Sequence, residues 1–209
     1  MIKILQFKKI YPGNTDPVLH IDHFEISKGI YWLHGSNGSG KTSLIKSMAG
    51  LVPFEGNIEV YGKNIFRHRL EYTKAVNYAE AEPLYPPFLT GNELIRFYRA
   101  TKGELFPEEL YIKLGVDKFA AQKTSTYSSG MMKKLSLVLA FIGEPSLILL
   151  DEPLIALDSA STVILQQHIN TCYGKGIGFL LTSHQDLSTA LLTGTQSLFI
   201  KNKTLSITA

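Results

Sequence analysis

Residues 34–43 read HGSNGSGKTS, and this stretch constrains the fold of the chain more than any other. The spacing Gly35-x4-Gly40-Lys41-Thr42 matches the pattern of a phosphate-binding loop between a strand and a helix. An apolar stretch ends just before it, and a helical run follows it and stops at Gly50. A glycine-serine turn without a ligand is the alternative, but the strand and the helix on either side favour a nucleotide-binding loop.

The glycines of such a loop let successive backbone N–H groups point into one concavity, where an anion can sit. The following helix adds the positive end of its dipole. Lys41 is expected to reach the β- and γ-phosphates of a nucleotide, and the hydroxyl of Thr42 to bind Mg²⁺. The residues expected around the phosphates are Gly35, Ser36, Asn37, Gly38, Ser39, Gly40, Lys41, Thr42 and Ser43.

A second motif carries two acids at the end of an apolar run. Leu147–Leu150 is followed by Asp151 and Glu152, and the run resembles a Walker B strand. Asp151 would hold the hydration shell of Mg²⁺, and Glu152 could polarise an attacking water. A buried strand that ends in a solvated turn is the alternative, and the phosphate-binding loop in the same chain argues against it.

The composition is ordinary for a globular protein and excludes some classes. The chain has 209 residues, 44% hydrophobic and 19% charged, and its net charge of +3 is too mild to argue for nucleic-acid binding. Cys172 is the only cysteine, so an internal disulfide is impossible, which suits a reducing cytosol. The N-terminus reads as a strand rather than a signal peptide, and no apolar run is long enough for a membrane span.

Hydrophobic periodicity predicts an α/β pattern with a helical insertion between about residues 80 and 130. Within the helical stretch, Leu94, Ile95, Phe97 and Tyr98 would form one apolar face. Strands are expected at 2–10, 18–26, 30–33, 57–61, 75–78, 147–150 and 177–182, and a closing hairpin at 197–207. Further helices are expected at 161–173 and 186–192.

Additional motifs follow in a characteristic order. Tyr127–Met131 looks like the signature L-S-G-G-Q and precedes a helix, Ala156–Asp158 resembles a D-loop, and Thr182–His184 resembles a switch-histidine motif. With Tyr11, thirty residues before Lys41, they make almost the entire chain similar to the ATP-binding subunits of ABC transporters. Taken alone, the serines before Gly130 would be a helix-start turn and Tyr11 a packed strand residue.

The resemblance implies one ABC ATPase domain over 1–209. Its P-loop core would cover about 1–80 and 145–209, with an antiparallel β portion near the N-terminus, and its helical subdomain about 82–143. The cofactors implied are ATP and Mg²⁺, the latter at Thr42 and Asp151. Tyr11 would stack on adenine, Glu152 and His184 would be catalytic, and the signature and D-loop residues Ser128, Ser129, Gly130 and Asp158 would also contact nucleotide.

Two departures from the family pattern stand out. The position of the Q-loop glutamine falls at Ala81, so either Glu80 or Glu82 replaces it or the site works without that ligand. In the signature, Ser129 stands where a glycine is usual, which predicts some loss of affinity. Lys133-Lys134, just after the signature, reads as a helix surface.

The resemblance implies an ATPase that energises transport through a separate transmembrane permease. Two copies, or this chain and a paired ABC ATPase subunit, would sandwich ATP, and the chain would lie in the cytoplasm against the inner face of the membrane. No nucleic-acid partner is expected. The alternatives are a soluble ABC ATPase that works mechanically on nucleic acid or ribosomes, and a regulatory nucleotide-binding module without turnover. The transported substrate and the direction of transport stay open.

Overall fold

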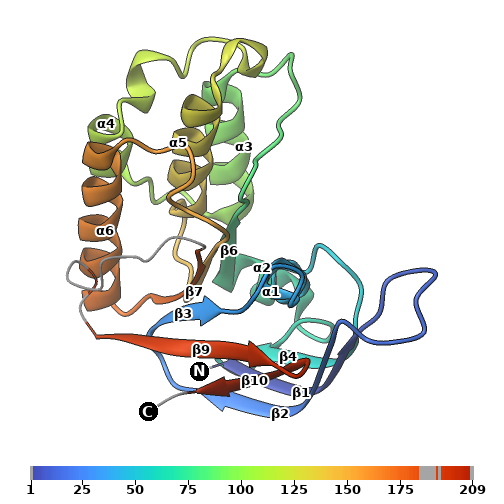
Figure 1. The fold of residues 1–209 in the computed structure, drawn as a ribbon. Helices are drawn as coiled ribbons and strands as arrows, with labels where there is room; N and C mark the ends of the chain where they lie inside the picture. Colours follow the sequence, from blue (N-terminus) through green and yellow to red (C-terminus); the bar gives the residue numbers. More distant parts are fainter. Residues whose placement is uncertain (1, 184–191, 193, 208–209) are drawn as a thin grey trace.

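The computed structural model describes residues 2–183, 192 and 194–207, which form two β-sheets and a group of helices (Figure 1). In the described residues the larger sheet has six strands in the order β10-β9-β3-β8-β7-β6. Strands β9, β3, β8, β7 and β6 are parallel, and β10 pairs antiparallel with β9. Their bounds, in sheet order, are Thr204–Ile207, Thr195–Lys201, Ile30–His34, Gly178–Thr182, Leu147–Leu150 and Val76–Ala79.

The smaller sheet is antiparallel and is built mainly from the N-terminal part of the chain. Its order is β2-β1-β4-β5, and the strands are Leu19–Ile26, Ile2–Lys9, Glu55–Val60 and Lys63–Asn64. A backbone bond from the N–H of His20 to the carbonyl of Lys203, 2.7 Å long, joins β2 to the β9–β10 hairpin. This arrangement confirms the predicted antiparallel portion beside an α/β core.

The helices are α1 Lys41–Met48, α2 Arg69–Ala75, α3 Gly91–Lys102, α4 Glu108–Lys113, α5 Ser129–Ala140 and α6 Ser159–Gly174. Figure 1 shows α3, α4, α5 and α6 on one side of the larger sheet and α1 between the two sheets. Thr90 caps α3: its hydroxyl accepts from the N–H of Glu93, whose carboxylate accepts from the N–H of Thr90.

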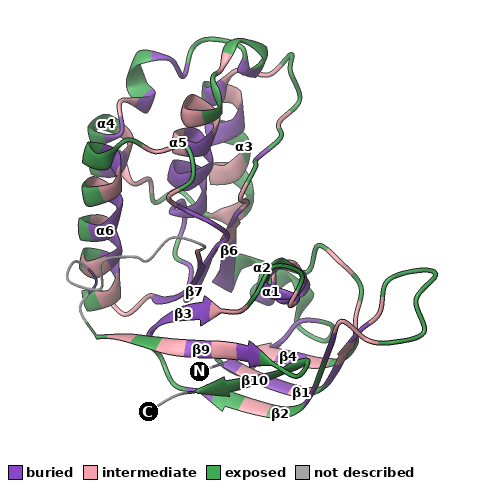
Figure 2. Ribbon diagram, in the orientation of Figure 1, coloured by how far each residue is buried: buried purple, intermediate pink, exposed green. Residues whose placement is uncertain are grey.

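Alternating side chains of the parallel strands supply two hydrophobic cores, and Figure 2 shows β3 and β7 coloured as buried. Ile148 and Leu150 of β7 face the helices, while Leu147 and Leu149 face α1 and the smaller sheet. All four residues of β7 are buried, as expected for a parallel strand that is covered on both faces. Burial on both sides fixes the ends of these strands in place, and the candidate site lies at their carboxyl ends.

Two local features differ from the sequence expectations, and a third expectation is not tested. Helix α2 was not predicted, because it is short and polar and is held by the tertiary bond from the Tyr72 hydroxyl to the carbonyl of Met48, 2.7 Å long. Phe97 is 62% exposed, so it does not belong to the buried face formed by Leu94 and Ile95. The helix expected at 186–192 falls almost entirely outside the described residues.

Candidate nucleotide-binding site

The phosphate-binding loop lies between β3 and α1, as the sequence predicted. Gly38 and Gly40 have φ angles of 76° and 102°, which other residues rarely adopt. At Gly40 a Cβ atom would also come within 2.8 Å of the Leu19 side chain, so this position needs glycine on two counts. The loop then enters α1, where the N–H of Leu44 donates to the carbonyl of Gly40 over 2.9 Å.

Lys41 lies across the mouth of this loop. Lys41 is 6% exposed, and its ammonium donates to the carbonyl oxygens of Gly35 at 2.6 Å and Ser36 at 3.3 Å. An ammonium has three donors and can redirect them to a triphosphate in the loop. The lysine is therefore placed where its charge can neutralise bound phosphates.

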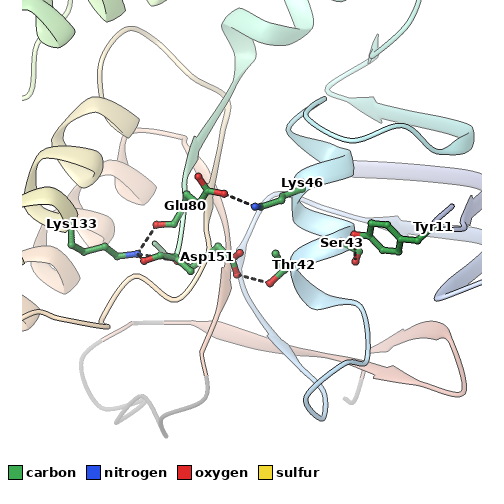
Figure 3. Close-up of polar contacts among 8 residues, drawn as sticks. Tyr11, Thr42, Ser43, Lys46, Glu80, Lys133 and Asp151 are labelled. Atoms are coloured by element: carbon green, nitrogen blue, oxygen red, sulfur yellow. Dashed lines mark hydrogen bonds and ion pairs between the residues drawn. The ribbon is translucent and has the colours of Figure 1, made fainter. Parts of the chain in front are cut away.

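Asp151 lies at the end of β7 and is held by hydroxyl groups from two other elements, of which Figure 3 shows the one from Thr42. Its Oδ1 accepts from Thr182 Oγ1 at 2.6 Å and from Thr42 Oγ1 at 3.4 Å. Asp151 is 1% exposed, and its Oδ2 makes no hydrogen bond of ordinary geometry in the described structure, while the buried hydroxyl of Tyr78 interacts with this carboxylate and has a raised pKa in part for that reason. A buried carboxylate is costly unless its charge is compensated, and a cation is a partner that suits it.

Thr182 is a site residue whose position can be traced to strand register. Strands β7 and β8 are parallel, with Leu150 beside Leu181, so Asp151 and Thr182 follow as neighbours. The Thr182 hydroxyl also accepts from the N–H of Glu152 at 2.9 Å. One threonine thus holds the carboxylate of Asp151 and the backbone of Glu152. No such role for Thr182 was expected from the sequence.

Glu152 leaves the strand in an unusual backbone conformation. Its φ is 45°, a region that residues other than glycine occupy rarely. The residue is 7% exposed and follows directly after the buried Asp151. Such strain is retained when the neighbouring structure over-determines it, as it does at many functional sites.

Tyr11 extends from the end of β1 toward the helix that follows the loop. Its hydroxyl lies 2.9 Å from Ser43 Oγ, and the Lys9 ammonium lies 4.3 Å from the centre of its ring. Tyr11 is 37% exposed, so one part of the ring is open to a ligand. The geometry places an aromatic ring next to α1, where the sequence expects adenine.

The signature residues begin α5. Ser128 caps this helix, and its Oγ accepts from the N–H of Met131 at 3.2 Å. A Cβ atom at Gly130 would approach the carbonyl of Ala156 to 2.9 Å, so this glycine permits a close contact with the D-loop. Ser128 and Ser129 are exposed, and Gly130 and Met131 of the first turn of α5 are partly exposed.

Asp158 of the D-loop has structural partners of its own. Its carboxylate caps α6 by accepting from the N–H of Ser161 at 2.7 Å and pairs with Lys134 at 3.0 Å. The bond from Ser161 and the ion pair with Lys134 hold the pKa of Asp158 well below its usual range. A contact between Asp158 and nucleotide stays a prediction.

The segment after β6 carries Glu80 and Glu82, the two candidates for the Q-loop ligand, and whether either of them replaces it stays a prediction. The Glu80 carboxylate forms an ion pair with Lys46 of α1, and Glu82 is exposed (Figure 3). The surface expectation for Lys133 is wrong: the residue is 1% exposed, and its ammonium donates to backbone carbonyls of this segment and of Asp151. No sequence signal indicates this position, because the acceptors are main-chain atoms far along the chain.

His184 lies outside the described residues, so its expected contact with the γ-phosphate stays a prediction. The described chain reaches Ser183 at the end of β8, one residue beyond Thr182. The phosphate-binding loop, Asp151 and Glu152 therefore meet at one edge of the parallel sheet, where ligands of α/β proteins bind.

This fold and site define a P-loop nucleoside triphosphatase with a second, antiparallel sheet and an appended set of helices. The model of the family described as "ABC transporter" matches residues 19–155. The chain belongs to this family.

Individual relatives agree with this assignment. The uncharacterized ABC transporter ATP-binding protein YybJ of Bacillus subtilis is 30% identical over 190 residues, with 88% of this chain and 85% of YybJ covered. The human retinal-specific phospholipid-transporting ATPase ABCA4 is 31% identical over 194 residues, with 88% of this chain covered. The match spans only 8% of the length of ABCA4, so that protein is far longer than this chain.

The fold also matches a solved structure of an ATP-binding cassette in a dimeric post-hydrolysis state with ADP and Pi. The TM-score is 0.82 at 20% identity, with 99% of this chain and 97% of the other covered. At this identity the match supports the fold alone.

Proposed function

We propose that this chain hydrolyses Mg²⁺-ATP to energise transport across a membrane through a separate permease. The family supports transport rather than mechanical work on nucleic acid or ribosomes. The observation that carries the proposal is the buried carboxylate of Asp151, which lies beside the Thr42 hydroxyl and the phosphate-binding loop. A regulatory module without turnover would not need Glu152 next to it.

Mg²⁺ fits these residues. The described chain contains no cluster of three or more His, Cys, Asp and Glu side chains that could hold a metal. Mg²⁺ commonly takes one or two protein oxygens plus waters and substrate phosphates, and Thr42 and Asp151 supply that set. When bound with ATP, the ion supplies charge neutralisation at the transferred phosphate.

The residues of the chain have separate roles in this reaction. Lys41 and the loop N–H groups bind the β- and γ-phosphates, and the exposed ring of Tyr11 stacks on the adenine. Glu152 orients the attacking water and accepts its proton, and His184 contacts the γ-phosphate. Thr182 holds Asp151 in place through its hydroxyl. Positioning and charge stabilisation contribute most to phosphoryl transfer, so these fixed groups suit the chemistry.

A second copy of the chain completes the site. Ser128, Ser129 and the N-terminus of α5 are exposed and offer donors and positive potential to an anion held by another chain. The ADP-bound cassette that shares this fold is itself dimeric. Asp158 lies near this face through its ion pair with Lys134 of α5. A paired, related ATPase subunit is the alternative partner.

The permease would dock on an apolar groove beside α3. The groove has a volume of 470 Å³, and its lining includes Leu51, Leu84 and Phe97, which are 60%, 89% and 62% exposed. Large exposed apolar side chains gathered in one place mark interaction surfaces. No helix in the described part of the chain is long and apolar enough to cross a bilayer. The chain would therefore be held at the inner face of the membrane by its partner.

Capture from detergent-treated membranes tests the partner. A tagged chain is compared with a variant that carries Leu84→Asp and Phe97→Asp, two changes at exposed side chains that leave the nucleotide site intact. We expect a protein with several membrane spans to co-purify with the unaltered chain and not with the variant, while both bind ATP alike. Recovery of ribosomes or nucleic acid, equal in the two samples, would instead favour the soluble ATPase.

A further inference from the structure

Lys133 occupies an unusual position for a lysine. It lies in the second turn of α5, it is 1% exposed, and all three donors of its ammonium are used. They reach the carbonyl oxygens of Glu80 at 2.8 Å, Ala81 at 3.1 Å and Asp151 at 3.1 Å. One side chain thus joins the signature helix to the ends of β6 and β7 (Figure 3).

Burying this cation is costly, which argues that the position has a purpose. Burial lowers the pKa of Lys133 to about 8, and the nearby carboxylates of Asp151, Glu152 and Glu80 partly oppose this effect. An apolar residue would avoid the desolvation cost but would leave three carbonyls without these donors. The three hydrogen bonds to carbonyl oxygens therefore offset the cost of burying Lys133 at this position.

Glu80 is held from the opposite side as well. Its carboxylate forms an ion pair with Lys46, which lies four residues after Thr42 on α1 and is 30% exposed in its side chain. The backbone of Glu80 is thus bound to α5, and its side chain is bound to α1. Residues 80 and 81 connect the helix that follows the phosphate-binding loop with the helix that follows the signature.

We propose that Lys133 is a positioning residue for ATP hydrolysis in this chain. Together with the Lys46–Glu80 pair it fixes Asp151 and the signature helix relative to the phosphate-binding loop. The hydrogen bonds from Lys133 to backbone carbonyls and the Lys46–Glu80 ion pair thereby link α5 to α1 through residues 80 and 81, although Ala81 has no polar side chain. The inference rests on the proposed function, since it assigns Lys133 to that same reaction.

Binding of ATP and its turnover should respond differently to a change at Lys133. Lys41 and the loop bind the triphosphate without help from Lys133, so ATP affinity should persist when Lys133 is changed. Displacing a metal-holding carboxylate or its supporting shell typically costs about 10- to 100-fold in activity. We therefore expect Lys133 to affect kcat and not KM.

The central variant is Lys133→Met, and Lys102→Met is its matched control. Lys102 of α3 also donates to backbone carbonyls, those of Thr73 and Val76, and burial lowers its pKa to about 8 as well. It belongs to another part of the chain from Asp151. Both variants remove a carbonyl-bonded lysine, so a loss that is only structural should appear in both.

In the full-length chain we expect kcat for Lys133→Met to fall about 10- to 100-fold, with ATP affinity within about twofold of the unaltered chain. Lys102→Met should keep its kcat. Amide hydrogen exchange without nucleotide should rise at residues 79–82 in Lys133→Met and stay unchanged in α1. Equal kcat in the two variants, with unchanged exchange at 79–82, would overturn the proposal.

Glu80→Gln tests the same linkage with little risk to folding, because the residue is only half-buried and keeps its backbone carbonyl. It should lower kcat, and adding Lys46→Met should lower it no further, since both remove one ion pair. Additive losses, or none, would count against the linkage. If the unaltered chain does not hydrolyse ATP, the proposed function fails instead, and the exchange at 79–82 then decides on Lys133 alone.

Discussion

Lys41, at the phosphate-binding loop, and Lys133, which bonds to Asp151, are both buried lysines that donate to backbone carbonyls. Lys41 binds two carbonyls of its own loop, at the edge of a site that is open to a ligand. Lys133 binds three carbonyls from two other strand ends and is almost completely enclosed. The same chemical group can thus serve a ligand or fix the framework, and its surroundings decide which.

The helices that carry the two lysines differ in a related way. Helix α1 begins at the phosphate-binding loop of its own chain, whereas α5 begins at the signature, whose serines are exposed. In the proposed shared site, α1 acts on ATP bound by the same chain and α5 acts on ATP bound by a second copy. Substitutions in either half can therefore separate the two roles.

The largest expected effect is on turnover, in Glu152→Gln. ATP binding should be retained, while the rate should fall about 10²–10⁴-fold because the proton acceptor is lost. An ATP-bound dimer should therefore accumulate, which size-exclusion chromatography would detect. Asp151→Asn is a useful companion, because it should weaken the response to Mg²⁺ instead. Hydrolysis at the normal rate in Glu152→Gln would place the base elsewhere.

Lys41→Ala is next and should act on binding. Charge-assisted bonds to two phosphates contribute about 3–4 kcal/mol, so ATP affinity should fall roughly 10²–10³-fold. Calorimetric titration measures this directly, and Lys9→Ala serves as a control that removes a neighbouring cation on the Tyr11 side. Unchanged affinity in Lys41→Ala would contradict the assignment of the loop.

Thr182→Val should have a smaller effect, on kcat. Valine keeps the shape of the side chain but removes the hydroxyl that donates to Asp151, so we expect a loss of about 10-fold. Thr182→Ser keeps the hydroxyl and should retain most of the activity. Steady-state ATPase rates compare the two, and equal losses would point to packing rather than to the hydrogen bond.

The smallest expected effect concerns the pH dependence of stability at Lys102. Its folded-state pKa of about 8 lies below the unfolded value of 10.5, so the unfolded chain binds more protons between these pH values. The free energy of unfolding should therefore rise with pH across that window, relative to Lys102→Met. Denaturant titrations of both proteins at several pH values across the window give the difference. A difference that is flat or falling would show that Lys102 is not desolvated.

Much of the site could be predicted because its chemistry is local in the sequence. The loop between β3 and α1 needs glycine for its backbone, and β7 needs apolar residues on both faces before its acids. These requirements produce a spacing of glycines, apolar residues and acids that can be recognised in the sequence. The order of the motifs along the chain then indicates which elements must lie together.

The parts that could not be predicted depend on contacts with main-chain atoms or on tertiary packing. Lys133 follows directly after Met132 and precedes another lysine, so nothing nearby in the sequence shows that backbone carbonyls of residues 80, 81 and 151 surround it. The sequence left Glu80 and Glu82 as equal candidates, and only the position of Lys46 distinguishes them. Helix α2 likewise forms through its contact with Met48.

The central claim is that ATP is shared between the Lys41 half of one copy and the signature half of another. Mixing two inactive variants, Lys41→Ala and Ser128→Arg, tests it most directly. At an ATP concentration far below the weakened affinity of Lys41→Ala, each alone should lack activity, since one then binds little ATP and the other blocks the approach of its phosphates. In an equal mixture about half of the dimers are mixed, and each has one intact site, so about a quarter of the normal rate should return. A mixture as inactive as its components, or a Ser128→Arg chain that is active by itself, would contradict the shared site.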